Sequence, residues 1–156
     1  MSATVALPPF WSLVEDHGDE LLAHARRMTD EQSAEDVLQD ALLRALRAYP
    51  KLRHADHLRA WLYRVTTTTA LDLHRRRRRE VPTEEPPAPA VEPEYDDGAF
   101  ESLIAPLAPT ARDVLRLRFV EDLDYDRIAA VLGTSPEAAR QRVSTAVRTL
   151  RERVTA

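Results

Sequence analysis

An acidic, proline-rich stretch limits the possible folds of this chain more than any other feature. Residues 80–101 hold eight carboxylates and five prolines but no lysine or arginine. Such a segment buries too little apolar surface to offset the entropy that ordering it would cost. We therefore expect a flexible linker over 80–101, between one domain over 10–79 and a smaller one over 102–156.

Both domains are predicted to be helical, which makes the chain an all-α protein. Apolar residues recur every three or four positions, and no segment alternates apolar with polar residues over strand length. Three glycines are too few for a phosphate-binding loop, and the lack of cysteine excludes disulfides and zinc knuckles. With no run of about 18 apolar residues and no signal peptide, we expect a cytoplasmic protein without membrane contact.

Three helices are expected in the first domain, at about 10–28, 33–49 and 56–79. Ser33 is expected to cap the second helix, because its hydroxyl suits the free amides of a first turn. Gly18 lies inside the first helix and costs about 1 kcal/mol relative to alanine, so a bend or break is expected there.

The third helix ends in five consecutive arginines, residues 75–79, which favour nucleic-acid binding. A solvated helix end is the alternative, since cations suit a helix C-terminus. Five arginines exceed that need, and near Arg59, Tyr63 and Arg64 they suit phosphate neutralisation and base stacking. Because Trp61 and Tyr63 lie two positions apart on a helix, we expect one of them to face outward.

The second domain has the residue pattern of a helix-turn-helix. Its helices are expected at about 111–120, 125–132 and 136–153. Asp124 suits the N-cap of the middle helix, Gly133 the left-handed position after it, and Ser135 the N-cap of the last helix. An ordinary helical hairpin would share this pattern.

The last helix favours DNA binding over a plain hairpin. Its outward face carries Arg140, Gln141, Ser144 and Arg148, with Arg142 at the flank. Arginine and glutamine pair bidentately with guanine and adenine edges, and Arg142 is placed to contact a phosphate.

Three stretches in this order resemble the extracytoplasmic-function sigma factors of the sigma-70 family. Residues 34–46, AEDVLQDALLRAL, and residues 58–65, LRAWLYRV, with the arginine run, are similar to region 2 of that family. Residues 111–123, ARDVLRLRFVEDL, with 128–133, resemble region 4. The resemblance covers nearly everything except the linker.

The resemblance implies a binding role in transcription initiation. Core RNA polymerase would be bound at its β′ clamp helices through Glu35, Asp36, Leu38, Gln39, Asp40 and Arg44. The minus-10 element would be opened and recognised through Arg59, Trp61, Tyr63, Arg64, Thr68, Arg75 and Arg76. The minus-35 element would be recognised through Arg140, Gln141, Arg142, Ser144 and Arg148, and region 4 would contact the β flap. An anti-sigma factor, where one exists, would be a further partner.

Three positions depart from the family pattern. Thr68 stands where an asparagine helps to recognise the minus-10 strand, Thr145 where an arginine often contacts DNA, and Ala138 where threonine is usual. The chain would then recognise an unusual promoter, or be a degenerate paralogue that holds polymerase without opening DNA well. A stand-alone helix-turn-helix regulator and a helical protein-binding module also stay open.

No catalytic or metal-binding motif occurs in the sequence. His17, Glu20 and His24 share a helix face, but such groups are usually surface residues, and no nucleophile has a visible base. We therefore predict no enzyme, no metal and no cofactor. The free chain is expected to flex about its linker, with the domains fixed only on polymerase or an inhibitor.

Overall fold

The computed structural model describes residues 7–52, 56–78 and 98–155, and within them it is helical without strands. This confirms the predicted all-α class. Most of the predicted linker, residues 80–97, lies outside the described residues. The elements are α1 (Phe10–Met28), α2 (Glu31–Ala48), a short 3-10 turn η1 (Tyr49–Lys51), α3 (Leu58–Arg78), α4 (Gly98–Ile104), α5 (Pro109–Phe119), α6 (Tyr125–Leu132) and α7 (Pro136–Thr155).

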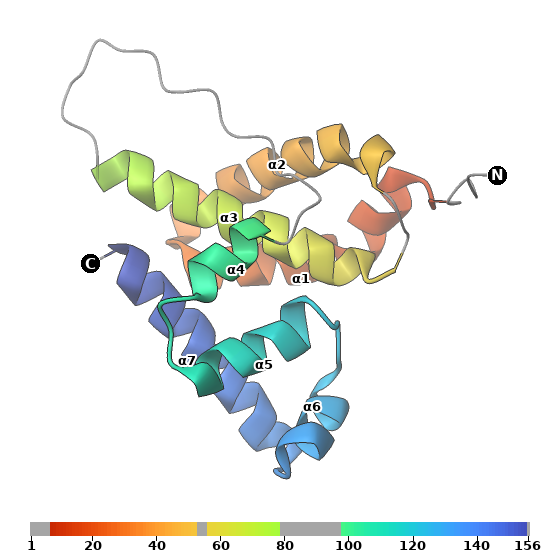
Figure 1. The fold of residues 1–156 in the computed structure, drawn as a ribbon. Coiled ribbons are helices and arrows are strands. Elements are labelled where there is room, and N and C mark those ends of the chain that lie inside the picture. The colour runs from red at the N-terminus through yellow and green to blue at the C-terminus, as the bar shows by residue number, and fades with distance from the viewer. Residues whose placement is uncertain (1–6, 53–55, 79–97, 156) are drawn as a thin grey trace.

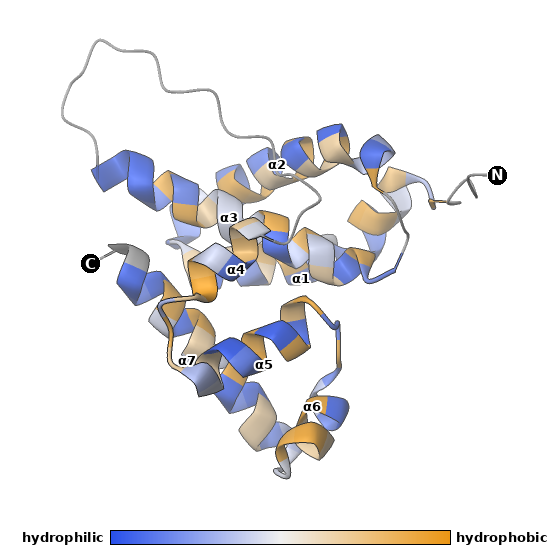
Figure 2. Ribbon diagram, viewed as in Figure 1, coloured by the Kyte–Doolittle hydropathy of each residue, from blue (hydrophilic) through white to orange (hydrophobic). Residues whose placement is uncertain are grey.

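Helices α1, α2 and α3 form the first domain, with α3 packed against both of the others (Figure 1). Large side chains fill the space between the three helices, and α2 contributes mainly alanines, which let the helices approach closely. The fully buried side chains include Leu21, Met28, Leu62 and Leu71. Figure 2 shows the opposite pattern at the end of α3, where the ribbon is hydrophilic.

Helix α1 runs unbroken through Gly18, so the expected break is wrong, while the alternative of a bend stays a prediction. A Cβ at this position would meet nothing within 4 Å. Packing of the apolar face of α1 against the other helices stabilises the helical backbone around Gly18. This packing compensates for the low helix propensity of glycine.

Gly18→Ala is therefore expected to stabilise the protein by about 0.5–1 kcal/mol, because alanine loses less backbone entropy and has room for its methyl group. Chemical denaturation measures the change. Gly133→Ala is the matched control: Gly133 has a φ of +66°, and alanine there is expected to cost about 1 kcal/mol or more. Equal signs for the two variants would contradict this account.

Helix α2 begins two residues earlier than expected, because Asp30 rather than Ser33 is its N-cap. The Asp30 carboxylate accepts a hydrogen bond from the Ser33 backbone amide at 2.8 Å. Ser33 is thus the capped residue, and its hydroxyl is free to meet a side chain from α3.

A run of four threonines lies in the middle of α3 without breaking it. Thr66, Thr67 and Thr69 are buried, and each hydroxyl donates to the carbonyl four residues back, at 2.7–2.8 Å. Because these hydroxyls find partners on their own helix, the run can be buried at little cost.

The second domain has the helix-turn-helix predicted from its caps. Asp124 accepts from the Arg127 amide at 2.9 Å, Gly133 takes the left-handed conformation, and the Ser135 hydroxyl accepts from the Ala138 amide at 3.1 Å. Three fully buried side chains, Leu115, Ile128 and Val143, join α5, α6 and α7.

Helix α4 was not expected, because its first four residues were counted as linker. Phe100 is buried edge-on against Phe119, with ring centroids 6.3 Å apart. Glu101 pairs with Arg116 at 2.7 Å. An aromatic side chain with a place to pack overrides the polar composition around it, so residues 98–101 are helical.

The two domains pack against each other, contrary to the expected flexible arrangement. Helices α5 and α7 lie against α1 and α3 (Figure 1). The Phe119 ring stacks on Tyr63 at 5.3 Å between centroids, Arg64 donates to the Phe119 carbonyl, and Arg151 donates to the Arg27 carbonyl at 3.1 Å. We call this the closed arrangement.

Candidate nucleic-acid interface

Helix α2 presents a mixed acidic and apolar surface to solvent. Glu35, Asp36 and Gln39 are exposed, and they share one side of the helix with Leu43 and Leu46, whose side chains are 54% and 45% exposed. We call these five residues the α2 face. Leu38 and Asp40 lie half-buried at its margins. The predicted docking set does not include these two leucines. Their spacing from Gln39 places them on the same side of the helix, opposite the alanines of the core, so the sequence contains the signal.

Arg44 points the other way, unlike the rest of the predicted docking set. Its side chain is buried, donates to Asp72 of α3 at 2.8 Å and pairs with Asp40 at 3.3 Å. It lies nine positions after Glu35, half a turn away around the helix. In this position Arg44 joins α2 to α3 and is not part of the exposed surface of α2.

The predicted minus-10 residues between Arg59 and Thr68 are buried or half-buried. We call Arg59, Tyr63, Arg64 and Thr68 the α3 set. Arg59 pairs with Glu20 at 3.0 Å, and Thr68 is half-buried. Phe119 of the second domain contacts the other two: its ring stacks on Tyr63, and its carbonyl accepts a hydrogen bond from Arg64.

The expectation that Trp61 or Tyr63 faces outward is wrong, since they are 7% and 9% exposed. Trp61 stacks with Tyr49 inside the first domain, at 6.3 Å between centroids. Tyr63 is covered from the other side by Phe119. Two aromatic residues so close on one helix are both buried because α3 lies between two layers.

His24 is buried, whereas the sequence predicts a surface position for it. It lies among Leu21, Ala25 and Met28, and this spacing alone predicts its burial. Its Nε2 is 2.7 Å from the Thr67 hydroxyl, and its ring packs against Tyr63 and Phe119 at 5.0 and 5.2 Å between centroids. Burial, with smaller contributions from Arg27 and Arg118, lowers the pKa of His24 from 6.5 to about 3.

Acidification is therefore expected to open the closed arrangement. Opening removes Phe119 and Arg118 from the imidazole and returns its pKa toward the ordinary value. The open form then binds the extra proton, so the closed form loses stability progressively as the pH falls from 6.5 toward 3. Small-angle scattering is expected to show a larger radius of gyration at about pH 5 than at about pH 7.5. An equal expansion in His24→Gln, which lacks this titration, would contradict the assignment.

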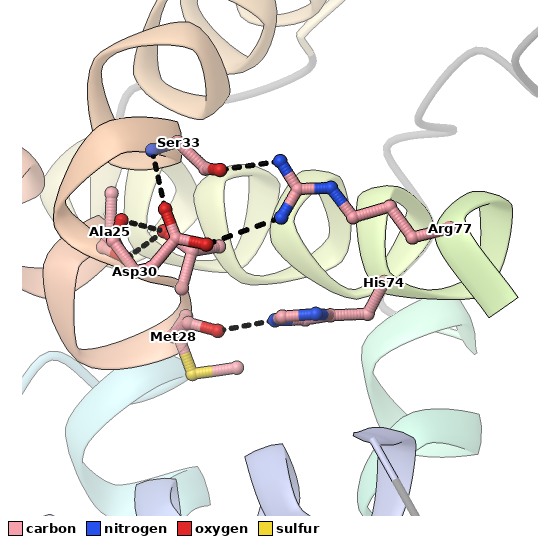
Figure 3. Close-up of polar contacts among 7 residues, drawn as sticks. Ala25, Met28, Asp30, Ser33, His74 and Arg77 are labelled. Carbon is pink, nitrogen blue, oxygen red and sulfur yellow. Dashed lines mark hydrogen bonds and ion pairs between the residues drawn. The ribbon is translucent and has the colours of Figure 1, made fainter.

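In the arginine run at the end of α3, one arginine contacts α2 and two others are exposed without contacting that helix's N-cap. Arg77 reaches the α2 N-cap, where it pairs with Asp30 at 3.3 Å and donates to the Ser33 hydroxyl (Figure 3). One turn earlier, His74 Nε2 lies 2.6 Å from the Met28 carbonyl (Figure 3). Arg75 and Arg76 are exposed, and these two were the predicted DNA contacts.

Helix α7 exposes the predicted polar surface. Arg140, Gln141, Arg142 and Arg148 are exposed, and Ser144 is half-buried. We call these five residues the α7 face. Arg140 lies over the Tyr125 ring, with Cζ 4.9 Å from the centroid. Thr145, at one departure from the family pattern, is half-buried.

Comparison with known proteins identifies the family. A model of sigma-70 region 2 matches residues 13–80, and a model of sigma-70 region 4 matches residues 103–152. The RNA polymerase sigma-E factor of Streptomyces coelicolor is 33% identical over 153 residues, covering 94% of this chain and 86% of that protein. The chain belongs to the sigma-70 family of RNA polymerase sigma factors.

Further relatives place this sigma factor in the extracytoplasmic-function (ECF) group. The ECF RNA polymerase sigma factor SigG of Mycobacterium tuberculosis is 33% identical over 179 residues, which cover 91% of this chain and 48% of that protein. The ECF sigma factor SigE of Mycolicibacterium smegmatis is 29% identical over 160 residues, covering 94% and 62%. The chain thus spans about half to three fifths of the length of these two curated relatives.

The described part of the sigma factor contains neither a candidate membrane-spanning helix nor a candidate metal cluster. None of the described helices is both long and apolar enough to cross a membrane. Among residues 7–52, 56–78 and 98–155, no three His, Asp or Glu side chains are grouped to hold a metal ion. Of the three acidic and histidine residues noted in α1, His17 pairs with Glu20 at 2.9 Å, whereas His24 turns inward.

Proposed function

We propose that this sigma factor binds core RNA polymerase and directs it to specific promoters. The α2 face would dock on the β′ clamp helices, and the α3 set with Arg75 and Arg76 would recognise the minus-10 element. The α7 face would recognise the minus-35 element, while the second domain contacts the β flap. The chain would act in the cytoplasm by binding alone, without a catalytic step or a cofactor of its own.

The α2 face is the observation that carries this proposal. It leaves Leu43 and Leu46 exposed beside two carboxylates and an amide. Large apolar side chains exposed among polar groups are typical of a surface that binds another protein. A stand-alone helix-turn-helix regulator would have no use for such a face on its other domain. A plain protein-binding module would leave the exposed arginines and glutamine of α7 without a role.

In the closed arrangement, two of the proposed minus-10 contacts are engaged by the second domain. The α2 and α7 faces are exposed, whereas Tyr63 and Arg64 are engaged with Phe119. Polymerase could therefore be bound at the α2 face first, and the domains would separate before α3 contacts DNA. The existence of an anti-sigma factor, and a changed promoter preference from Thr68 and Thr145, stay predictions from the resemblance.

Transcription from a pool of randomised promoters tests the proposal. Core polymerase with this chain is expected to transcribe templates that share two spaced elements, whereas core alone selects none. Polymerase binding without selective transcription would indicate a degenerate paralogue. Duplex binding by the chain alone, with no effect on polymerase, would indicate a stand-alone regulator.

A further inference from the structure

We propose that Tyr125 is a positioning residue that holds Arg140 in place for base recognition. The inference rests on the proposed role of the α7 face and extends it to a residue outside that face. Tyr125 is the first residue of α6, and Arg140 lies in the first turns of α7. Two guanidinium groups lie over its ring: Arg118 Cζ is 4.5 Å and Arg140 Cζ is 4.9 Å from the centroid.

The contact between Arg118 and Tyr125 anchors the tyrosine to the domain. Arg118 is 9% exposed, and its Nη1 donates to the Leu123 carbonyl at 3.0 Å. Its position is therefore fixed by the turn between α5 and α6. A buried, hydrogen-bonded guanidinium over an aromatic ring holds that ring in a single orientation.

Arg140 is the exposed one of the two arginines, and its contact with Tyr125 limits the conformations of its side chain. Its side chain is exposed, so in the absence of a support it would sample many rotamers, and each would be lost on binding DNA. The contact with the Tyr125 ring restricts those rotamers beforehand, and a cation–π contact uses none of the hydrogen-bond donors of the guanidinium. Two of those donors can then bind a guanine edge.

A double-mutant cycle in the holoenzyme tests this inference. Polymerase holoenzyme containing this chain is first used to select duplexes from a pool randomised at the upstream element. Binding is then compared between the selected duplex and its single-base variants. Arg140→Ala is expected to lose about ten-fold or more discrimination at one base position. Tyr125→Leu is expected to lose about two- to five-fold at the same position, as expected for one cation–π contact.

Two further variants separate positioning from a structural role. Tyr125→Phe keeps the ring and is expected to retain the wild-type discrimination. In the Arg140→Ala background, Tyr125→Leu is expected to have no further effect on discrimination, because the residue acts through Arg140. Thermal unfolding of each variant identifies any loss of fold.

The possible outcomes are distinguishable. An unchanged base preference in Tyr125→Leu, with the preference lost in Arg140→Ala, would overturn the positioning role alone. An equal loss from Tyr125→Leu in both backgrounds would also overturn it, because the tyrosine would then act independently of Arg140. If the wild-type holoenzyme selected no upstream sequence, the proposed function would fail, and the inference with it.

Discussion

Replacing Phe119 with alanine is expected to separate the two domains of the free chain. Phe119 stacks on Tyr63, packs against His24 and places its carbonyl beside Arg64. Removing a buried phenylalanine side chain costs about 3–5 kcal/mol. Part of that cost falls on the second domain, where Phe119 also contacts Phe100. The remainder falls on the contact between the domains, which has few other aromatic contacts among the described residues.

Separation would also uncover Tyr63 and Arg64, the two members of the α3 set that contact Phe119. Because Phe119 is not among the proposed DNA contacts, its loss is expected to raise the affinity of the free chain for single-stranded minus-10 DNA. The same change at Tyr63 would remove a proposed contact and could not give this result. Scattering measures the separation, and fluorescence anisotropy with a labelled oligonucleotide measures the binding.

Phe119→Leu is the control, since it keeps most of the apolar volume but not the ring stacking. It is expected to give an intermediate expansion. Circular dichroism establishes that helix content is retained in both variants. A Phe119→Ala chain that kept the radius of the parent would show that other contacts hold the domains together.

The second large effect is expected at the α2 face. Replacing Asp36 and Gln39 together with alanine is expected to weaken binding to core polymerase by about ten-fold or more. Both side chains are exposed and alanine favours a helix, so the fold should be unchanged. Charge and amide groups that contact a partner surface set affinity and specificity in complexes of this kind. Titration of labelled chain with core polymerase measures the change.

A control on α1 makes this result specific. Asp16 and Asp19 are exposed there, and replacing both with alanine removes one more charge than the test variant does. Their loss is expected to leave core binding nearly unchanged. If both double variants weakened binding equally, net charge rather than the α2 face would control it.

The second domain could be predicted closely because its signals are local. Asp124, Gly133 and Ser135 each act within four residues of their own position, so the sequence shows them directly. The start of α2 was placed two residues late for a related reason: Asp30 and Ser33 are both good caps, and only the structure shows which one accepts the hydrogen bond.

What the sequence could not show depends on distant partners. Arg44 is buried because Asp72 lies beside it, 28 positions away along the chain. Tyr63 is buried because Phe119 of the other domain covers it. Helical spacing shows which residues share a face, but it does not show which faces meet. For the same reason, the closed arrangement and the α4 helix appeared only with the structure.

Competition for core polymerase tests the central claim most directly. Labelled chain, known to be folded from its circular dichroism, is mixed with bacterial core RNA polymerase and a rising concentration of a housekeeping sigma factor. We expect the chain to bind core and to be displaced by the competitor, because both would occupy the β′ clamp helices. A folded chain that did not bind core polymerase would contradict the proposed function and leave a DNA-binding helix-turn-helix protein as the better account.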